Sequence, residues 1–461
     1  MGQHGEHRGL VAAIPGNARI LAATILGSSL AFIDGSVVNV ALPAIQADLR
    51  ADAAAMQWVV DAYLLLLGAL VLLGGALGDR LGRVRVFMAG IVVFTAASLA
   101  CGLAPGAASL IAARGVQGLG AALVVPGSLA IIGAAIPADR RAAAIGTWSG
   151  AGALTTAFGP VLGGWLVDAV SWRAVFLINL PLAAATLWLA RGIPDSQGAG
   201  AAGPLDWPGA MLAAAGLGLV TFGFIAAPGQ GYGVPVLACL VGGVALLAAF
   251  AVAEARHPAP MVLLGLFRSR EFSGANGLTL LLYFALTGVL FFLPFLLIGA
   301  HGYSATAAGA ALLPLSLLLG GLSRAVGRLA GRVGARPLLV AGPVLAGLGF
   351  ALLGLRAGDA AYGTGVLPGM LALAAGMTLA VAPLTTAVMA SAPDGQAGAA
   401  SGINNAVARI AGLLAVSILG ALATSAGDAV AGFRHVAYAA AACALGAAAI
   451  AAATIPRKMP A

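Results

Sequence analysis

A series of long apolar runs, separated by short polar segments, constrains this chain more than any other feature of its sequence. Hydrophobic residues make up 61% of its 461 positions and charged residues only 8%, whereas charged residues make up about 25% of an ordinary soluble domain. A helix needs about 20 apolar residues to cross a bilayer, because its backbone groups find no water there and must bond to one another. The chain is therefore predicted to be an all-α polytopic membrane protein.

Fourteen runs are long enough to span, with the N-terminal run interpreted as a retained signal anchor. They are expected near residues 19–42, 57–78, 84–103, 107–135, 142–168, 173–193, 207–227, 233–254, 272–299, 304–323, 337–356, 364–390, 397–423 and 433–454. If the N-terminus lies inside, 17 Lys and Arg residues fall on the inner side and 4 on the outer side. Because cytoplasmic loops carry the excess of positive charge, both termini are predicted to be cytoplasmic.

Two similar segments indicate an internal duplication. Residues 75–85 (GALGDRLGRVR) lie between the second and third runs, and residues 327–336 (GRLAGRVGAR) repeat their glycines, leucine and arginine, with Gly331 in place of Asp79. Both segments are predicted to be short, tightly turned loops. Residues 137–146 and 393–402 form a second matching pair.

The repeats divide the chain into two six-helix bundles, residues 1–193 and 272–461, joined by a 194–271 linker that contains two additional spans. Two repeated bundles are typical of transporters, whose substrate site lies at the interface between the repeats near the middle of the bilayer.

Composition and motifs exclude several other functions. The net charge of +8 comes from arginines scattered among loops rather than from a basic face with interleaved aromatics, so no nucleic acid is expected as a partner. The three cysteines lie in apolar runs without metal-like or paired spacing, which predicts core side chains and no metal site. With no Walker A motif or nucleophile elbow, the protein is not expected to be an enzyme or ATP-driven.

Ionisable side chains inside a span cost about 2.5–3.5 kcal/mol on insertion scales, so each is a functional candidate. Asp34 is predicted to carry protons, because an apolar cavity favours the protonated carboxyl group; the alternative is a structural acid bonded to Asn39 or to a neighbouring helix. Asp61 is a second candidate proton carrier, near the outer end of its run, and its alternative is a solvated helix-end residue.

Two arginines also lie within runs. Arg114 keeps its proton and is predicted to be a fixed charge that tunes a carboxylate or binds an anion, with a packing hydrogen bond as the alternative. Arg409 has no counterpart in the first half. Asp168 and Glu254, at span ends, are interpreted as solvated interface residues.

The fifth run contains Gly159, Pro160, Gly163 and Gly164, whereas its repeat has Ala415 and Val416 at the first two positions. Proline kinks a helix and small residues admit a close neighbour, so this asymmetric motif is expected to seal or gate one face. Further residues could line a substrate cavity, although most membrane aromatics serve packing or anchor the interface. These candidates are Phe32, Trp58, Tyr63, Gln117, Phe158, Phe284, Phe291, Asn405 and Arg409.

Taken in order, these motifs resemble the major facilitator superfamily and, within it, the fourteen-span drug:proton antiporters of the EmrB/QacA type. The resemblance covers nearly the whole chain. It rests on GALGDRLGRVR, ARGVQGLGAA (from Ala113), GPVLGG (from Gly159), IDGSVVNVALP (from Ile33, with Ser36 where threonine is usual), SWRAVFLINLPL (from Ser171) and EARHPAPMVLLGLFRSREF (from Glu254).

The resemblance implies a secondary active transporter of alternating access, driven by a proton gradient without a cofactor, in a bacterial inner membrane. It implies that Asp34 and Arg114 take part in proton coupling, and that Asp79 locks the cytoplasmic side near the start of the thirteenth span, where residues 396–402 begin. The other lock residues are Gly75, Arg80, Gly82 and Arg83. One departure is that no glutamate lies mid-membrane, which weakens the expectation of a lipophilic cation as substrate.

The first hypothesis is therefore proton-coupled antiport that exports amphipathic, lipophilic small molecules, as in multidrug efflux. Its partners would be the substrate, protons, the lipid bilayer and, in a Gram-negative cell, a periplasmic adaptor. The alternative is a dedicated exporter of one metabolite or self-made antibiotic. A non-transporting membrane sensor is a remote third, since it needs a soluble signalling domain and the short termini are not expected to supply one.

Overall fold

The computed structural model describes residues 16–197, 205–258, 260–393 and 396–456, and every regular element in these ranges is helical. The first half contains α2 (Gly16–Leu49), α3 (Ala53–Leu81), α4 (Arg83–Gly102), α5 (Ala107–Ala135), α6 (Ala138–Ala169), α7 (Ala174–Leu177) and α8 (Asn179–Ala190). The central helices are α9 (Trp207–Gln230), α10 (Val234–Arg256) and the short η1 (Leu264–Arg268). The second half contains α11 (Arg270–Pro294), η2 (Phe295–Ala300), α12 (Ala305–Ala310), α13 (Leu313–Val333), α14 (Ala335–Leu355), η3 (Tyr362–Val366), α15 (Leu367–Ala390), α16 (Ala397–Thr424) and α17 (Ala429–Thr454).

Within the described residues, 13 helices are long and apolar enough to cross a membrane. The run predicted at 173–193 forms a shorter apolar helix, Ala174–Ala190, which is interrupted between α7 and α8. Pro181 explains the interruption, since it lacks the N–H that would bond back across the break. Arg8, Arg457, Lys458 and linker residues 198–204, which entered the sequence argument, lie outside the described residues.

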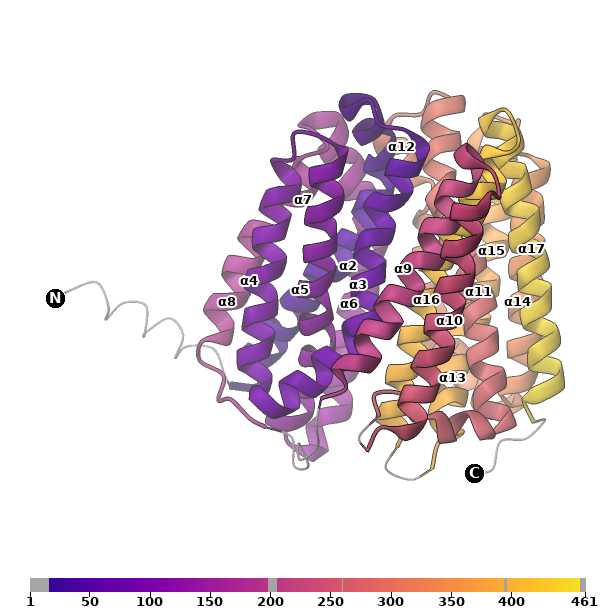
Figure 1. Cartoon of the computed structure of the whole chain (residues 1–461). Coiled ribbons are helices and arrows are strands. Elements are labelled where there is room, and N and C mark those ends of the chain that lie inside the picture. The colour runs from indigo at the N-terminus through magenta and orange to yellow at the C-terminus, as the bar shows by residue number, and fades with distance from the viewer. Residues whose placement is uncertain (1–15, 198–204, 259, 394–395, 457–461) are drawn as a thin grey trace.

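The helices form two bundles that lie side by side (Figure 1). In the first bundle α2 packs against α5, α6 and α8, while α3 and α4 both pack against α5. In the second, α14 packs against α15 and α17, and α11 against α16 and α17. The seam between the bundles is formed by α3 against α16 and by α6 against α12 and α13.

The two inserted helices differ in their surroundings. Helix α9 packs against α10 and also against α3 and α16, so it covers one side of the seam between the bundles (Figure 1). Helix α10 has the highest hydropathy of the spans, 2.6, and only 11% of its most apolar window is buried. An apolar helix that the protein leaves uncovered is suited to contact with lipid.

Small residues allow the closest helix contacts. A side chain at Gly118 of α5 would collide with the Tyr63 carbonyl oxygen of α3, and one at Gly74 of α3 would collide with the Ala122 carbonyl oxygen of α5. Lipid chains are as apolar as leucine, so helices in a membrane associate through close packing rather than through the hydrophobic effect. These two glycines therefore allow α3 and α5 to approach closely. Both helices contain residues of the candidate site.

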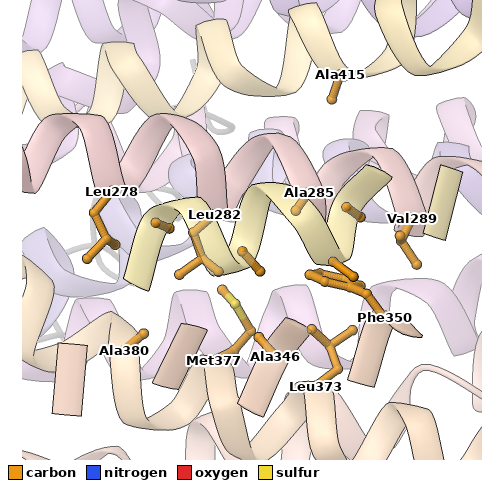
Figure 2. Close-up of a cluster of buried hydrophobic side chains, with 14 of the residues drawn as sticks. Leu278, Leu282, Ala285, Val289, Ala346, Phe350, Leu373, Met377, Ala380 and Ala415 are labelled. Atoms are coloured by element: carbon orange, nitrogen blue, oxygen red, sulfur yellow. The ribbon is translucent and has the colours of Figure 1, made fainter. Parts of the chain in front are cut away.

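The core of the second bundle follows helical spacing (Figure 2). Leu278, Leu282 and Val289 of α11 pack in one cluster with Phe350 of α14 and Met377 of α15, all fully or almost fully buried. The intervals of three and four residues place these side chains on one face of each helix. The second bundle thus has a single closely packed core.

The prediction of a loop over residues 75–85 is wrong, because all of these residues except Gly82 are helical. Helix α3 continues to Leu81 and α4 begins at Arg83, so Gly82 alone makes the turn, with φ at 107°. Gly334, at the matching position of the second copy, turns between α13 and α14 with φ at 84°. Glycine adopts positive φ without steric cost whereas the flanking residues are compatible with helix, so the break contracts to one residue.

Candidate functional site

A cavity of about 360 Å³ lies between the two bundles. Residues of α2, α3, α5 and α6 line it from the first bundle, and residues of α11, α13 and α16 from the second. Its walls combine leucine and aromatic side chains with hydroxyl, amide and guanidinium groups. Such a mixture suits an amphipathic ligand, because a few polar groups orient it while apolar walls cover the rest.

Arg114, which lines this cavity, pairs with the buried carboxylate of Asp34. Arg114 Nη1 donates to Asp34 Oδ2 at 2.5 Å, and Gln117 Nε2 donates to Asp34 Oδ1 at 2.8 Å. Arg114 Nε also donates to the Val59 carbonyl at 2.9 Å, and the guanidinium lies 4.3 Å from the Tyr63 ring centroid. Arg114 is thus fixed on the wall of the cavity with Asp34 behind it, and α5 rather than Asn39 supplies the partners of Asp34.

The polar network continues behind Asp34 from Gln117 to Ser98 and Asn179, two residues that were not predicted from the sequence. Gln117 Nε2 also donates to Ser98 Oγ of α4 at 2.8 Å, and Asn179 Nδ2 of α8 donates to the same oxygen at 3.2 Å. All three side chains are fully buried. A polar residue inside an apolar run was the sequence signal that could have identified Ser98 and Asn179. Asn179 lies within the SWRAVFLINLPL segment.

Asp61 occupies a different buried site. It is 0% exposed, so the solvated helix-end alternative is wrong, and neither carboxylate oxygen has a hydrogen-bond partner among the described residues. Trp58, one turn before it, lies 6.4 Å from Phe222 of α9 by ring centroids. Leu65, one turn after it, packs at Gly218 of α9. Helical spacing therefore directs Asp61 toward α9.

Thr221 of α9 lies between those two contacts and is another residue that sequence reasoning missed. Other buried threonines donate to the carbonyl four residues earlier, as Thr186 and Thr378 do. The Thr221 hydroxyl has no partner among the described residues, although it is 0% exposed. The interface between α3 and α9 thus contains an unpaired carboxyl group and an unpaired hydroxyl group, away from the central cavity.

Of the predicted cavity residues, four line the central cavity: Phe32, Tyr63, Asn405 and Arg409. Gln117 lies behind its wall in the Asp34 network. The remaining aromatics lie elsewhere: Trp58 against α9, Phe284 in a pocket formed with α9 and α17, Phe291 in a third pocket, and Phe158 exposed. Cavity residues that were not predicted include Asn39, Tyr283, Thr287 and Ser316, for which helical spacing alone gives no direction.

The glycine motif of α6 meets the second bundle at the end of the molecule opposite Gly82, called here the far end. A side chain at Gly164 would collide with the Ala305 carbonyl oxygen, and one at Gly309 would collide with the Pro160 carbonyl oxygen. The motif thus lies where α6 and α12 approach closely, as expected for small residues. Gly159 and Gly163 instead pack against Ser36 and Val37 of α2.

Asp168 strengthens the far-end contact. The sequence suggested only a solvated residue at the end of a span. The Asp168 carboxylate accepts hydrogen bonds from Ala305 N at 3.1 Å, Thr306 N at 2.8 Å and Thr306 Oγ1 at 2.6 Å. A carboxylate at a helix N-terminus satisfies free N–H groups and complements the helix dipole. Glu254 is also misplaced by the sequence argument, because it is 1% exposed and accepts from Val262 N at 2.9 Å.

The seam is open between α6 and α13 at the other end, called here the turn end because it contains Gly82. Positions on α6 (Gly146, Gly150) and on α13 (Gly320, Gly327) have no atom within 4 Å of the place a Cβ would occupy. Helices α3 and α16 remain in contact at this end, since the Leu72 side chain of α3 lies 3.3 Å from the position that a Cβ would occupy at Gly402 of α16. The protein is therefore closed at the far end and open at the turn end.

The predicted lock segment lies at the turn end and bonds within its own bundle. Arg83 forms an ion pair with Asp79 at 2.8 Å. Val84 N donates to Asp195 Oδ1 at 2.9 Å, so Asp195, from the segment after α8, caps α4. In this open conformation the partner of Asp79 is Arg83 rather than the start of α16. Gly75 packs near Pro126 of α5, and Arg80 lies in the last turn of α3.

Two bundles that enclose a largely apolar cavity with a few polar groups, closed at one end and open at the other, define a membrane transporter. Within the described ranges, no group of three or more His, Cys, Asp or Glu residues could hold a metal ion. The family model described as Major Facilitator Superfamily matches residues 24–416. The chain belongs to the Major Facilitator Superfamily.

Curated relatives and solved structures agree with this assignment. The chain is 36% identical to the multidrug resistance protein Stp of Mycobacterium tuberculosis (strain CDC 1551 / Oshkosh), over 87% of this chain and 75% of that protein. It is 38% identical to the cephamycin export protein CmcT of Amycolatopsis lactamdurans, over 85% of this chain and 82% of that protein. A bacterial homologue of the human lysosomal transporter Spinster, in an inward-facing conformation, shares the fold with a TM-score of 0.69 at 18% identity, covering 95% of this chain and 97% of that one.

These comparisons confirm the coarse predictions. The protein is a multi-pass membrane transporter rather than an enzyme, since the family and its relatives are transporters. The bacterial relatives are consistent with a location in the bacterial inner membrane, and their names connect this group with efflux and antibiotic resistance.

Proposed function

We propose that this protein is a proton-coupled antiporter that exports amphipathic small molecules by alternating access. The observation that carries the proposal is the Asp34–Arg114 pair, which is buried and contributes Arg114 to the wall of the cavity between the bundles. A proton that binds Asp34 cancels its charge and weakens the ion pair, so Arg114 becomes free to reorient within the cavity. Proton occupancy and cavity shape are then linked in one place.

The proposal includes a topology of fourteen spans with cytoplasmic termini, of the EmrB/QacA type, in which the turn end faces the cytoplasm. The described structure would then be inward-facing. Residues 1–193 and 272–461 would be the moving bundles, with 194–271 as the linker and its two inserted helices. Asp61 would be a second proton carrier, because it too is a buried carboxyl group and, unlike Asp34, has no hydrogen-bond or ion-pair partner among the described residues.

The first experiment is a drug-susceptibility panel in an efflux-deficient bacterial host. The compound with the strongest protection is then studied with purified protein in liposomes under an imposed pH gradient. The wild type is expected to accumulate the compound against its concentration gradient, whereas Asp34→Asn should show the level of protein-free liposomes. Asp139→Asn, an exposed acid with 74% side-chain accessibility, is the matched control. Transport that persists after the gradient is collapsed, or in Asp34→Asn, would refute proton coupling.

Dedicated export of one compound is the second candidate, favoured by a relative that is named for the export of a single antibiotic. The same panel separates the two functions. Protection against chemically unrelated compounds supports multidrug efflux, whereas protection against one compound class, together with a neighbouring biosynthetic operon, supports dedicated export.

A further inference from the structure

The charges on the wall of the central cavity are of one sign. Among the residues that line it, the charged side chains are Arg114 and Arg409, and no aspartate or glutamate is present. Arg114 is neutralised by Asp34 behind the wall. The net charge that a ligand meets therefore depends on Arg409.

Arg409 has no counter-ion within the protein as described. None of the ion pairs in the described ranges includes it, and its Nε is buried without a hydrogen-bond partner. Arg409 packs against Gly68 of α3: its Cβ lies 3.6 Å from the position that a Cβ would occupy at that glycine. The Arg409 side chain therefore begins at the seam between the bundles. An arginine in a membrane protein is costly and keeps its charge, so such residues normally pair with an acid or serve a ligand.

Other hydrogen-bond donors and acceptors accompany Arg409 on the same wall. Asn405 lies one turn before it on α16, and Tyr63, Tyr283 and Ser316 face the cavity from α3, α11 and α13. The walls are otherwise apolar, with leucines from α3, α11 and α13. The cavity thus has one cationic position, several neutral polar groups and a large apolar surface.

We infer that the exported molecules are amphipathic acids, and that Arg409 binds their carboxylate. A guanidinium group offers parallel N–H donors that match the two oxygens of a carboxylate. A lipophilic cation would instead meet a like charge without a compensating acid on the lining. This inference names the substrate class of the proposed exporter, and in that respect it rests on the proposed function.

The inference has a consequence for the energetics of transport. Exchange of one inward proton for one outward monovalent anion moves two charge equivalents across the membrane per cycle, since both movements make the interior more positive. A membrane potential with a negative interior drives both steps. Transport of an acid should therefore respond to the potential as well as to the pH gradient.

The test uses three matched fluorescent probes: dansyl-leucine, its uncharged methyl ester, and the amine dansylcadaverine. Their binding to purified full-length protein in detergent is measured by fluorescence titration, which needs no gradient. The wild type is expected to bind the acid at least about tenfold more tightly than the ester, because a hydrogen bond to a charged group contributes about one such factor or more. Arg409→Gln should remove that preference and leave ester binding unchanged, and Arg409→Lys should retain part of it.

Arg434→Gln, an exposed arginine beyond the cavity, is the control. Equal binding of acid and ester by the wild type, preferential binding of the amine, or an equal loss for all three probes in Arg409→Gln would each overturn the inference. If Arg409→Gln fails to give a monodisperse protein, the wild-type comparison and Arg409→Lys still decide. In the wild type, gradient-driven efflux without a preference for the acid would refute this inference alone, whereas preference for the acid without gradient-driven transport would refute the antiport proposal alone.

Discussion

At the scale of single residues, the buried ion pair is the most consequential feature. Asp34 and Arg114 are 0% and 1% exposed, and each has at least one further hydrogen-bond partner besides the other. A charge in such a place is tolerated because its partner compensates it, so the two residues must be considered as one unit. The same unit is where a proton would have the largest effect on neighbouring groups.

Removal of one member should therefore be worse than removal of both. Arg114→Gln leaves the Asp34 carboxylate without its counter-charge and is expected to destabilise the protein by about 3–5 kcal/mol. In the double variant Asp34→Asn/Arg114→Gln, both charges are gone and much of that stability should return. Thermal unfolding of the single and double variants in detergent completes the cycle. Strictly additive losses would show that the two residues do not act as a unit.

At the scale of elements, α6 and α12 decide which end of the seam is closed. Their contact depends on the absence of side chains at Gly164 and Gly309 and on the Asp168 carboxylate at the start of α12. Helix α9 has a comparable role for Asp61, because it covers a face of α3 that would otherwise be open to lipid. Small and polar side chains at such contacts determine which helices can approach each other.

Gly164→Leu is expected to prevent closure of the far end, because a side chain there overlaps the Ala305 backbone. The variant should insert normally but lose at least about tenfold in transport rate, a factor that corresponds to about 1.4 kcal/mol in the barrier of the closing step. Gly146→Leu, on the same helix with open space around it, is the matched control. Equal transport by the two variants would contradict the closing role of this contact.

At the scale of the whole molecule, the two bundles can exchange which end is closed. In the described conformation Asp79 pairs with Arg83, and the turn end is open between α6 and α13. When that end closes, Asp79 is expected to approach the N-terminus of α16, where the helix dipole favours a negative charge. The lock is then a change of partner rather than a permanent contact.

Asp79→Asn should therefore shift the population toward the conformation that is open at the turn end, without loss of insertion. The measurement is the rate at which a thiol reagent labels Ser316→Cys in the cavity, after the three native cysteines are replaced by alanine. Labelling is expected to be faster in Asp79→Asn by up to about fivefold, since a dipole contact contributes about 0.3–1 kcal/mol. Asp139→Asn, an exposed acid at the same end, should leave the rate unchanged, and an unchanged rate in Asp79→Asn would count against the lock.

The sequence by itself determined the membrane-spanning helices and the order of the motifs, because hydropathy, span length and loop charge are local properties of the chain. It also identified Asp34, Asp61, Arg114 and Arg409 as the ionisable residues within spans, since each is conspicuous in an apolar run. It misjudged the extent of the turn at Gly82 and did not predict the break between α7 and α8, because one glycine or one proline decides the geometry there.

Only the tertiary structure decided which of these residues meet. Asp34 and Arg114 are 80 positions apart, and their ion pair exists because α2 and α5 pack together. Asp61 faces α9, while Arg409 lines the cavity without a counter-ion from the described residues. Helical spacing fixes which residues share a face, but the direction of that face depends on contacts between helices far apart in the chain, and these contacts determine where a charge is paired, covered or left free.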